Sequence, residues 1–252
     1  MRVVKFAIKG EPRWGVLDGP EVALFKGHPE FCDYETTGER IPLKDVTVLP
    51  PTLPTTKIVC IGKNYADHAA EMGGDAPTEP LIFLKPSTSL IADKETIVLP
   101  KISNRVDHEG ELAIVIGAIA KDVKEEEAFD VVMGFTIAND VTARDLQEKD
   151  GQWTRAKGFD TFCPVGPWIE TDFRPDGQLI ETRVDGDVRQ HASIDLMIHG
   201  VERIVSHVSQ AMTLLPGDII LTGTPAGIGE IESGQTVEVT IEGIGTLTNP
   251  VA

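Results

Sequence analysis

The first fifty residues carry short apolar stretches, each ended by turn-forming residues. The stretches lie at 3–8, 14–17 and 22–25. Because glycine and proline occur between them, they are typical of β-strands joined by tight turns. A proline-rich segment at 49–54 follows, and this composition favours a stiff connector. The pattern predicts a small N-terminal β module at 1–54 and a main body at 55–252.

The main body also carries mostly strand patterns. The expected strands lie at 57–61, 81–84, 96–99, 111–116, 131–138, 179–184, 218–222 and 237–242. Helices are expected at 65–72, at 141–149 and at 201–212, where apolar residues share one face. Because strands outnumber helices and do not alternate with them, the pattern predicts a mainly β fold with a few helices (α+β). A Rossmann or TIM-barrel fold is disfavoured for the same reason.

The composition narrows the possible partners. With 23 Lys and Arg against 40 Asp and Glu, the net charge of −17 argues against nucleic acid or an anionic membrane. The cysteines, Cys32, Cys60 and Cys163, form no C-x-x-C pair. The longest strongly apolar run, at 112–120, is too short to span a bilayer. We therefore expect a cytoplasmic protein with reduced cysteines.

Two carboxylates lie at the start of that apolar run. Glu109 and Glu111 are two residues apart, so on a strand their side chains point to the same face. Asp140 ends a second apolar strand. Neighbouring carboxylates are costly to bury unless a cation neutralises them, and oxygen ligands suit Mg²⁺, Mn²⁺ or Ca²⁺. From the residues alone, a solvated Glu-x-Glu and an Asp140 helix N-cap remain alternatives.

Six segments carry a family resemblance. They are IVCIGKNYADH at 58–68, FLKP at 83–86, HEGEL at 108–112, NDVTARDLQ at 139–147, KGFD at 157–160 and TGTPAGIG at 222–229. In this order they resemble the fumarylacetoacetate hydrolase superfamily. The similar branch is the shorter bacterial and archaeal one, with acylpyruvate hydrolases, oxaloacetate decarboxylases and isomerases of aromatic catabolism. The short segment before the main body departs from fumarylacetoacetase proper and argues against fumarylacetoacetate as the substrate.

The resemblance implies a fold, a metal and a substrate class. The fold would be a mixed β-sandwich roll with the active site in its mouth, usually in homodimers. Glu109, Glu111 and Asp140 would hold Mg²⁺ or Mn²⁺, with Ca²⁺ possible in crystals. The substrate would be a small-molecule 2-oxo acid.

Three residues are expected to be catalytic. His68 and Glu71 are three apart on an expected helix, so they share a face, and a histidine oriented by a carboxylate can act as a general base. The resemblance implies such a pair on a mobile lid, where the glycines at 73–74 would form a hinge. Lys157 is expected to stabilise negative charge on the substrate. A solvated helix face and a surface lysine are the alternatives.

Three further residues are expected to bind substrate. Arg144 and Gln147 are also three apart on one expected helix. Arg144 would hold a carboxylate through two hydrogen bonds, and Gln147 would donate to a keto oxygen. Thr224 lies in a Gly-rich segment without the lysine of a phosphate-binding loop, and its hydroxyl would donate to the substrate. A surface Arg–Glu pair and a purely structural turn are the alternatives.

The residues and the resemblance together predict a metal-dependent enzyme. It would cleave or isomerise short 2-oxo or 2,4-dioxo acids through an enolate that the metal stabilises, as an acylpyruvate hydrolase or an oxaloacetate-type decarboxylase. The alternatives are 2-hydroxyhepta-2,4-diene-1,7-dioate isomerase, 5-carboxymethyl-2-oxo-hex-3-ene-1,7-dioate decarboxylase and oxaloacetate tautomerase. A non-catalytic metal-binding protein with the same fold is an alternative of another class.

Overall fold

The structure is a computed structural model, and it describes residues 1–29, 34–54 and 56–252. The strands are β1 (Arg2–Ile8), β2 (Glu11–Asp18), β3 (Glu21–Lys26), β4 (Glu35–Pro42), β5 (Thr47–Val48), β6 (Ile58–Gly62), β7 (Leu81–Lys85), β8 (Leu90–Ile91), β9 (Val106–His108), β10 (Gly110–Ile116), β11 (Val132–Asn139), β12 (Thr142–Ala143), β13 (Cys163–Glu170), β14 (Leu179–Val184), β15 (Asp187–Ser193), β16 (Ile219–Leu221), β17 (Gly229–Glu230), β18 (Thr236–Ile241) and β19 (Gly245–Pro250). The α-helices are α1 (Ala66–Glu71), α2 (Arg144–Asp150), α3 (Thr154–Lys157) and α4 (Val201–Ala211). Short 3₁₀ turns are η1 (Leu43–Asp45), η2 (Ser87–Ser89), η3 (Glu125–Val131) and η4 (Ile194–Leu196).

Within the described residues the strands form three sheets. The 12-stranded sheet has the order β4-β3-β2-β1-β13-β11-β10-β16-β6-β7, with β5 beside β1 and β8 beside β13. A four-stranded sheet has the order β15-β14-β18-β19, and a three-stranded sheet has the order β12-β9-β17. The mainly β fold with a few helices is therefore confirmed.

The core of the main body lies between the two larger sheets and α4. Leu112 and Ile114 of β10 pack with side chains of β14, β18 and α4 in one buried cluster. Ala113 points to the opposite face of the sheet, where it packs with Cys60 and Cys163. Because β10 is buried on both faces, its sequence is continuously apolar rather than alternating. Both of these cysteines are free thiols, whereas Cys32 lies outside the described residues.

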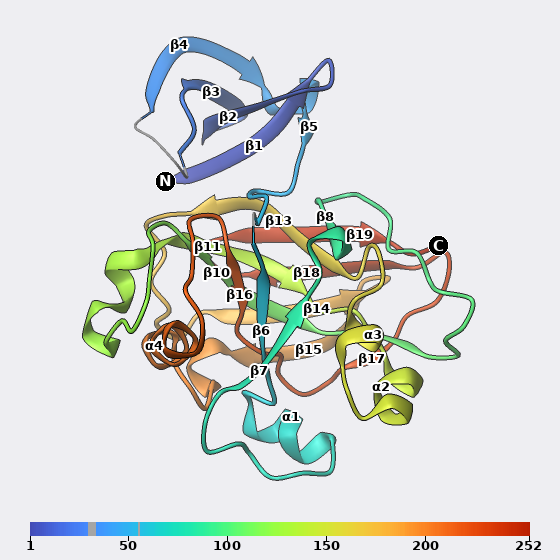
Figure 1. The fold of residues 1–252 in the computed structure, drawn as a ribbon. Coiled ribbons are helices and arrows are strands. Elements are labelled where there is room, and N and C mark those ends of the chain that lie inside the picture. Colours follow the sequence, from blue (N-terminus) through green and yellow to red (C-terminus); the bar gives the residue numbers. More distant parts are fainter. Residues whose placement is uncertain (30–33, 55) are drawn as a thin grey trace.

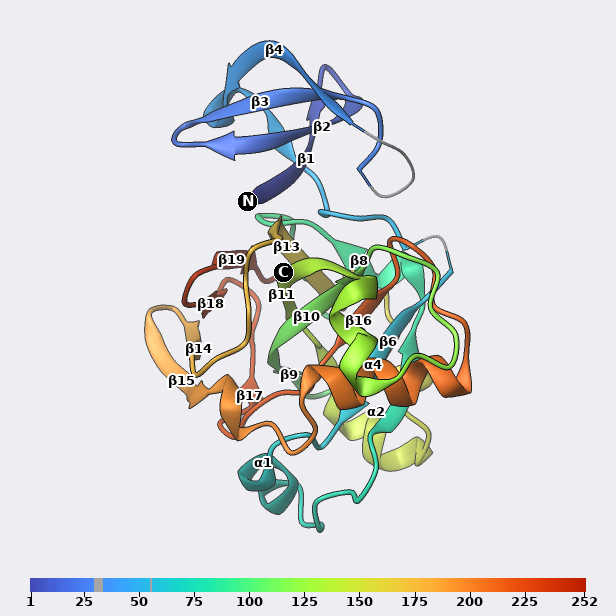
Figure 2. The ribbon, with the colours of Figure 1, turned by 90° about the vertical axis from the view of Figure 1, so that its left-hand side faces the viewer.

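The N-terminal strands form a small unit at one end of the body, opposite α1 (Figure 1, Figure 2). β1, β2 and β3 occur where the apolar stretches predict them. β1 also pairs with β13, which joins this unit to the large sheet. Val3, Trp14 and Phe25 share a buried apolar cluster with Val115 and Ile169 of the body. The unit is therefore held by packing as well as by the connecting chain.

Two expected elements of the main body are wrong. The segment expected as a strand at 96–99 forms only an isolated bridge, from Ile97 to Val251. The helix expected at 141–149 begins at Arg144, because the β-branched residue Thr142 and its neighbour Ala143 form β12 and pair with β9. The helix N-cap is Ala143, so Asp140 is not the cap.

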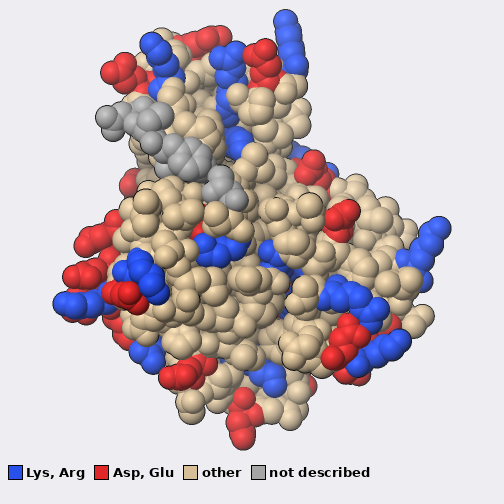
Figure 3. Space-filling model, viewed as in Figure 1, with Lys and Arg blue, Asp and Glu red and all other residues tan. Residues whose placement is uncertain are grey.

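Charged side chains are spread widely over the surface. On the face shown in Figure 3, acidic side chains lie mainly at the periphery and on the N-terminal unit, and they do not gather in one patch. None of the helices in the described part of the chain combines the length and the apolar character needed to cross a bilayer.

Candidate active site

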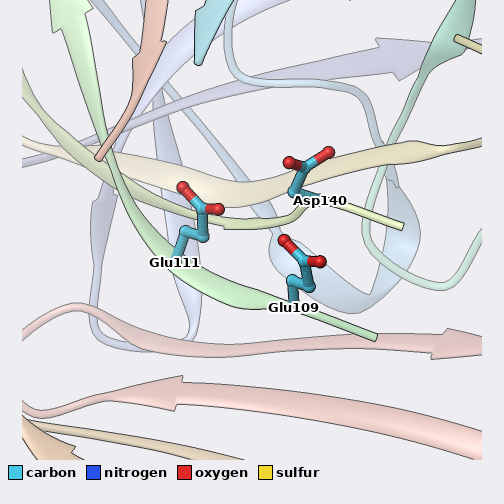
Figure 4. Close-up of side chains that lie close together, drawn as sticks. All are labelled: Glu109, Glu111 and Asp140. Atoms are coloured by element: carbon cyan, nitrogen blue, oxygen red, sulfur yellow. The ribbon is translucent and has the colours of Figure 1, made fainter. Parts of the chain in front are cut away.

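The ends of β10 and β11 bring three carboxylates together. The two strands are antiparallel, and Gly110 pairs with Asn139. The Asp140 N–H donates to the Glu109 carbonyl over 2.8 Å. The carboxylates of Glu109, Glu111 and Asp140 point toward one another (Figure 4), and their ligand atoms lie within 4.8 Å of one another. The three carboxylates therefore lie together as expected from the strand pattern, although Glu109 itself lies between β9 and β10.

The three carboxylates of the triad differ in their contacts with lysine and arginine. Burial opposes the charge on Glu109, but Lys157 and Arg144 outweigh it and hold the pKa of Glu109 below its usual value. Burial raises the pKa of Glu111 well above its usual value, and the neighbouring Asp140 and Glu109 raise it further. Glu111 accepts the Gly223 N–H over 2.6 Å. Among the described residues it has no ion pair with a lysine or arginine.

These donors fit a hard divalent cation. The ligand atoms of the triad lie within 4.8 Å of one another, close enough for all three to contact one cation, and oxygen ligands are those that Mg²⁺, Mn²⁺ and Ca²⁺ prefer. All three side chains are buried. A divalent cation would supply the positive charge that Glu111 lacks, so the residues present fit a metal.

Two buried lysines lie against the triad. Lys157 Nζ is 3.0 Å from Glu109 Oε2 and 2.6 Å from Asp140 Oδ2. Burial opposes its charge, but Asp140 and Glu109 outweigh burial and raise the pKa of Lys157. Lys85 Nζ lies 2.5 Å from Asp140 Oδ1 and also donates to the Val141 carbonyl. Sequence reasoning assigned no role to Lys85, although it ends the FLKP segment.

His68 and Glu71 meet as expected. His68 Nδ1 lies 3.2 Å from Glu71 Oε2, and the ring lines the same pocket as the triad. Glu71 Oε1 also accepts the Gly227 N–H over 3.1 Å, so this carboxylate links α1 to the Gly-rich segment. The helix ends with hydrogen bonds from the N–H groups of residues 73 and 74 to the last turn, which is the Schellman arrangement.

The three expected substrate-binding residues have protein partners. Arg144 donates to Asp107 over 2.9 Å, to Glu109 over 2.5 Å and to Gln147 over 2.5 Å. Arg144 and Gln147 both line the pocket. Thr224 also lines it, but its hydroxyl donates to the Gly110 carbonyl over 2.9 Å. In this conformation Thr224 therefore holds the backbone between the two glutamates.

The remaining pocket wall is largely apolar. It includes Ile61, Met72, Phe83 and Trp153. The Lys157 ammonium lies 5.0 Å from the centre of the Phe83 ring and 6.0 Å from that of Trp153. The structure thus places Trp153 at the pocket. A cation that contacts aromatic faces in this way gains cation–π stabilisation.

We expect Gly110→Ala to destabilise the protein by about 1–3 kcal/mol, the range found for overpacked cores. An added Cβ would lie 2.3 Å from Thr182 Oγ1 and 2.9 Å from Val239 Cγ1. Because Gly110 separates Glu109 from Glu111, the same shift should weaken Mn²⁺ binding. Urea unfolding with chelator and calorimetry with Mn²⁺ measure the two effects.

Gly229→Ala is the matched control for this prediction. Its Cβ would meet only His108 Nε2, at an ordinary 3.6 Å, so its free energy of unfolding should change by no more than about 0.5 kcal/mol. Equal stability of both variants would contradict the assignment of tight packing to Gly110.

Comparison with known proteins identifies the family. Residues 57–252 match the family model described as fumarylacetoacetate (FAA) hydrolase C-terminal, and residues 1–51 match Rv2993c-like, N-terminal. Protein Rv2993c of Mycobacterium tuberculosis is 61% identical over 228 residues, 89% of this chain and 84% of the relative. The oxaloacetate tautomerase YisK of Bacillus subtilis is 40% identical over 215 residues, 80% of this chain and 71% of the relative.

Solved structures show the same relationship. A 2-hydroxyhepta-2,4-diene-1,7-dioate isomerase from Mycobacterium marinum has a TM-score of 0.93 and 50% identity, covering 100% of this chain and 99% of its own. Fumarylpyruvate hydrolase from Pseudomonas aeruginosa, in complex with Mn²⁺ and pyruvate, has a TM-score of 0.74 and 34% identity, covering 79% and 91%. Three of these four relatives carry the names of enzymes, and these enzymes differ in reaction type. The chain therefore belongs to the fumarylacetoacetate hydrolase family.

Proposed function

We propose that the protein is a divalent-metal-dependent enzyme that cleaves or isomerises short 2-oxo or 2,4-dioxo acids. The observation that carries the proposal is the convergence, in one pocket, of a buried carboxylate triad, Lys157 and His68, whose ring Glu71 contacts. The cavity volume of the pocket is only about 20 Å³, about the space of one water molecule.

Glu109, Glu111 and Asp140 would hold Mg²⁺ or Mn²⁺. When bound, the metal supplies Lewis-acid stabilisation of negative charge on the oxygens of a 2-oxo acid. The Mn²⁺ and pyruvate named for the Pseudomonas aeruginosa hydrolase support this choice of metal and acid. Lys85 would keep Asp140 in place from the other side, since its ammonium contacts the Asp140 carboxylate.

The remaining groups would handle charge and protons. Lys157 places a buried ammonium beside the triad, where it favours negative charge that develops on a bound acid. Glu71 fixes the Nδ1 side of the His68 ring, which leaves Nε2 to take a proton from water or from substrate carbon. Arg144 would orient Glu109, to which it donates, and Gln147 would hold Arg144 by accepting from its guanidinium.

Hydrolysis, decarboxylation and isomerisation differ in what happens at the carbons next to the keto group. A hydrolase needs His68 to activate water toward a 4-keto group, whereas a tautomerase needs it only to move a proton. The relatives YisK and the Mycobacterium marinum isomerase support the second use, and fumarylpyruvate hydrolase supports the first. All three reactions would use the triad and Lys157.

The test is a substrate panel with product analysis. Purified protein is assayed on acetylpyruvate and oxaloacetate with Mg²⁺, with Mn²⁺ and with EDTA. We expect turnover of at least one acid and loss of that turnover in EDTA, with recovery on adding Mn²⁺. Full activity in EDTA would contradict metal dependence. Metal binding without turnover of any 2-oxo acid would favour a non-catalytic binding protein.

A further inference from the structure

Lys63 differs from the other lysines and the arginine at the site in its ion-pair partners. Arg144, Lys157 and Lys85 each form an ion pair with a buried carboxylate of the site. Lys63 lines the same pocket, yet among the described residues it forms no ion pair with an aspartate or glutamate. The pocket therefore presents a fourth cation, which has no acidic partner among the described residues.

The backbone holds Lys63 in an unusual conformation. Its φ of 56° lies in the left-handed region, which is strained for a residue with a side chain and persists only where the surroundings fix it. The next residue, Asn64, is fully buried and exchanges hydrogen bonds with the backbone of His199 and Thr222. These contacts fix the backbone next to Lys63, which directly follows β6, and so fix the direction of its side chain.

The Lys63 side chain extends toward the C-terminal end of α1. A Cβ built on Gly74 would lie 2.8 Å from Lys63 Nζ, so the ammonium lies against the turn that follows α1. The adjacent Gly62 lets Trp153 approach closely, because a Cβ there would lie 2.6 Å from the indole ring. Met72, Trp153 and Phe83 line the same pocket as Lys63 and form an apolar wall.

We infer that Lys63 is a specificity-determining residue that binds the second carboxylate of a dicarboxylic 2-oxo acid. This inference rests on the proposed function, in which the first carboxylate and the keto group bind at the triad. The apolar wall suits a short carbon chain between the two ends of such a substrate. The Lys63 ammonium, which has no acidic partner in the described part of the chain, supplies the charge complement of the distal carboxylate.

The test compares acids of equal chain length that differ only in the distal carboxylate. Binding of 2-oxoglutarate and of 2-oxopentanoate to the Mn²⁺-loaded protein is measured by calorimetry, so the readout does not require turnover. Charge-assisted hydrogen bonds contribute about 1.5–3 kcal/mol, so we expect the wild type to prefer 2-oxoglutarate by about 10-fold or more. Oxaloacetate against 2-oxobutanoate repeats the comparison with a shorter chain.

Two variants isolate the charge of Lys63. Lys63→Met keeps the length and the left-handed backbone cost but removes the charge, and it should lose the preference while still binding 2-oxopentanoate as the wild type does. Lys63→Arg should retain the preference. A preference that survives in Lys63→Met, or an equal affinity of the wild type for both acids, would overturn the inference alone. Failure of both acids to bind the wild type would overturn the proposed function and the inference with it.

Discussion

Glu111→Gln should abolish tight Mn²⁺ binding and leave the metal-free protein as stable as the wild type, or more so. Glu111 has a pKa raised well above its usual value, because burial and then Asp140 and Glu109 disfavour its charge. Glutamine reproduces the shape of the neutral acid and keeps an oxygen for the Gly223 N–H. Replacing a residue that only supports the metal ligands typically lowers metal affinity by roughly 10–100-fold. Because Glu111 is itself expected to be a ligand, its replacement should lower Mn²⁺ affinity by more.

Glu109→Gln is the matched variant, and we expect the opposite effect on stability. Its carboxylate pairs with both Lys157 and Arg144. Removing one partner of a buried ion pair typically destabilises a protein by about 3–5 kcal/mol. The free energy of unfolding of the metal-free protein should therefore fall for Glu109→Gln only, although both variants should lose Mn²⁺.

The pH dependence gives the sign of the Glu109 contribution. Because the pKa of Glu109 lies below its usual value, its contribution to stability is present above the pKa of the unfolded chain. It is lost as pH falls through the folded-state pKa. The gap in stability between the wild type and Glu109→Gln should therefore narrow in acid. Calorimetry with Mn²⁺ measures metal affinity, and urea unfolding at several pH values measures the free energy of unfolding. Unaltered Mn²⁺ binding by Glu111→Gln would contradict the assignment of the triad as the metal site.

The triad could be predicted because its signal is local. Glu109 and Glu111 begin an apolar run and Asp140 follows another, and strand pairing brings the two ends together. Lys85 was missed because its partner Asp140 lies 55 residues away in the sequence. A signal was present, since Lys85 and Phe83 are two apart on β7 and therefore share the face that lines the site.

Strand β13 shows a second reason why part of the fold could not be predicted from the sequence. It lies between β1 and β11 in the large sheet, yet no strand was expected there. Pro164 and Pro167 fall within it, and proline normally argues against a central strand because it lacks the N–H of the ladder. The pairing of β13 with β11 is irregular, with a register shift between Phe135 and Ile137. Only the tertiary arrangement shows that the sheet accommodates these prolines.

His68→Gln should lower kcat for hydrolysis of a 2,4-dioxo acid by about 10²–10⁴-fold, the range for a positioned general base. His68 pairs with Glu71 at 3.2 Å and contributes no ligand atom to the carboxylate triad. Mn²⁺ affinity should therefore stay at the wild-type value. Steady-state kinetics on acetylpyruvate and calorimetry with Mn²⁺ separate the two effects.

Glu71→Gln tests how the base is oriented. Glutamine keeps the length of the side chain and an acceptor for the Gly227 N–H, but it removes the carboxylate charge beside His68 Nδ1. We expect a smaller fall in kcat than for His68→Gln, because the ring is still present but has lost the carboxylate that orients it. Unchanged hydrolysis in His68→Gln would assign water activation to another group, and unchanged hydrolysis in Glu71→Gln would remove Glu71 from the pair.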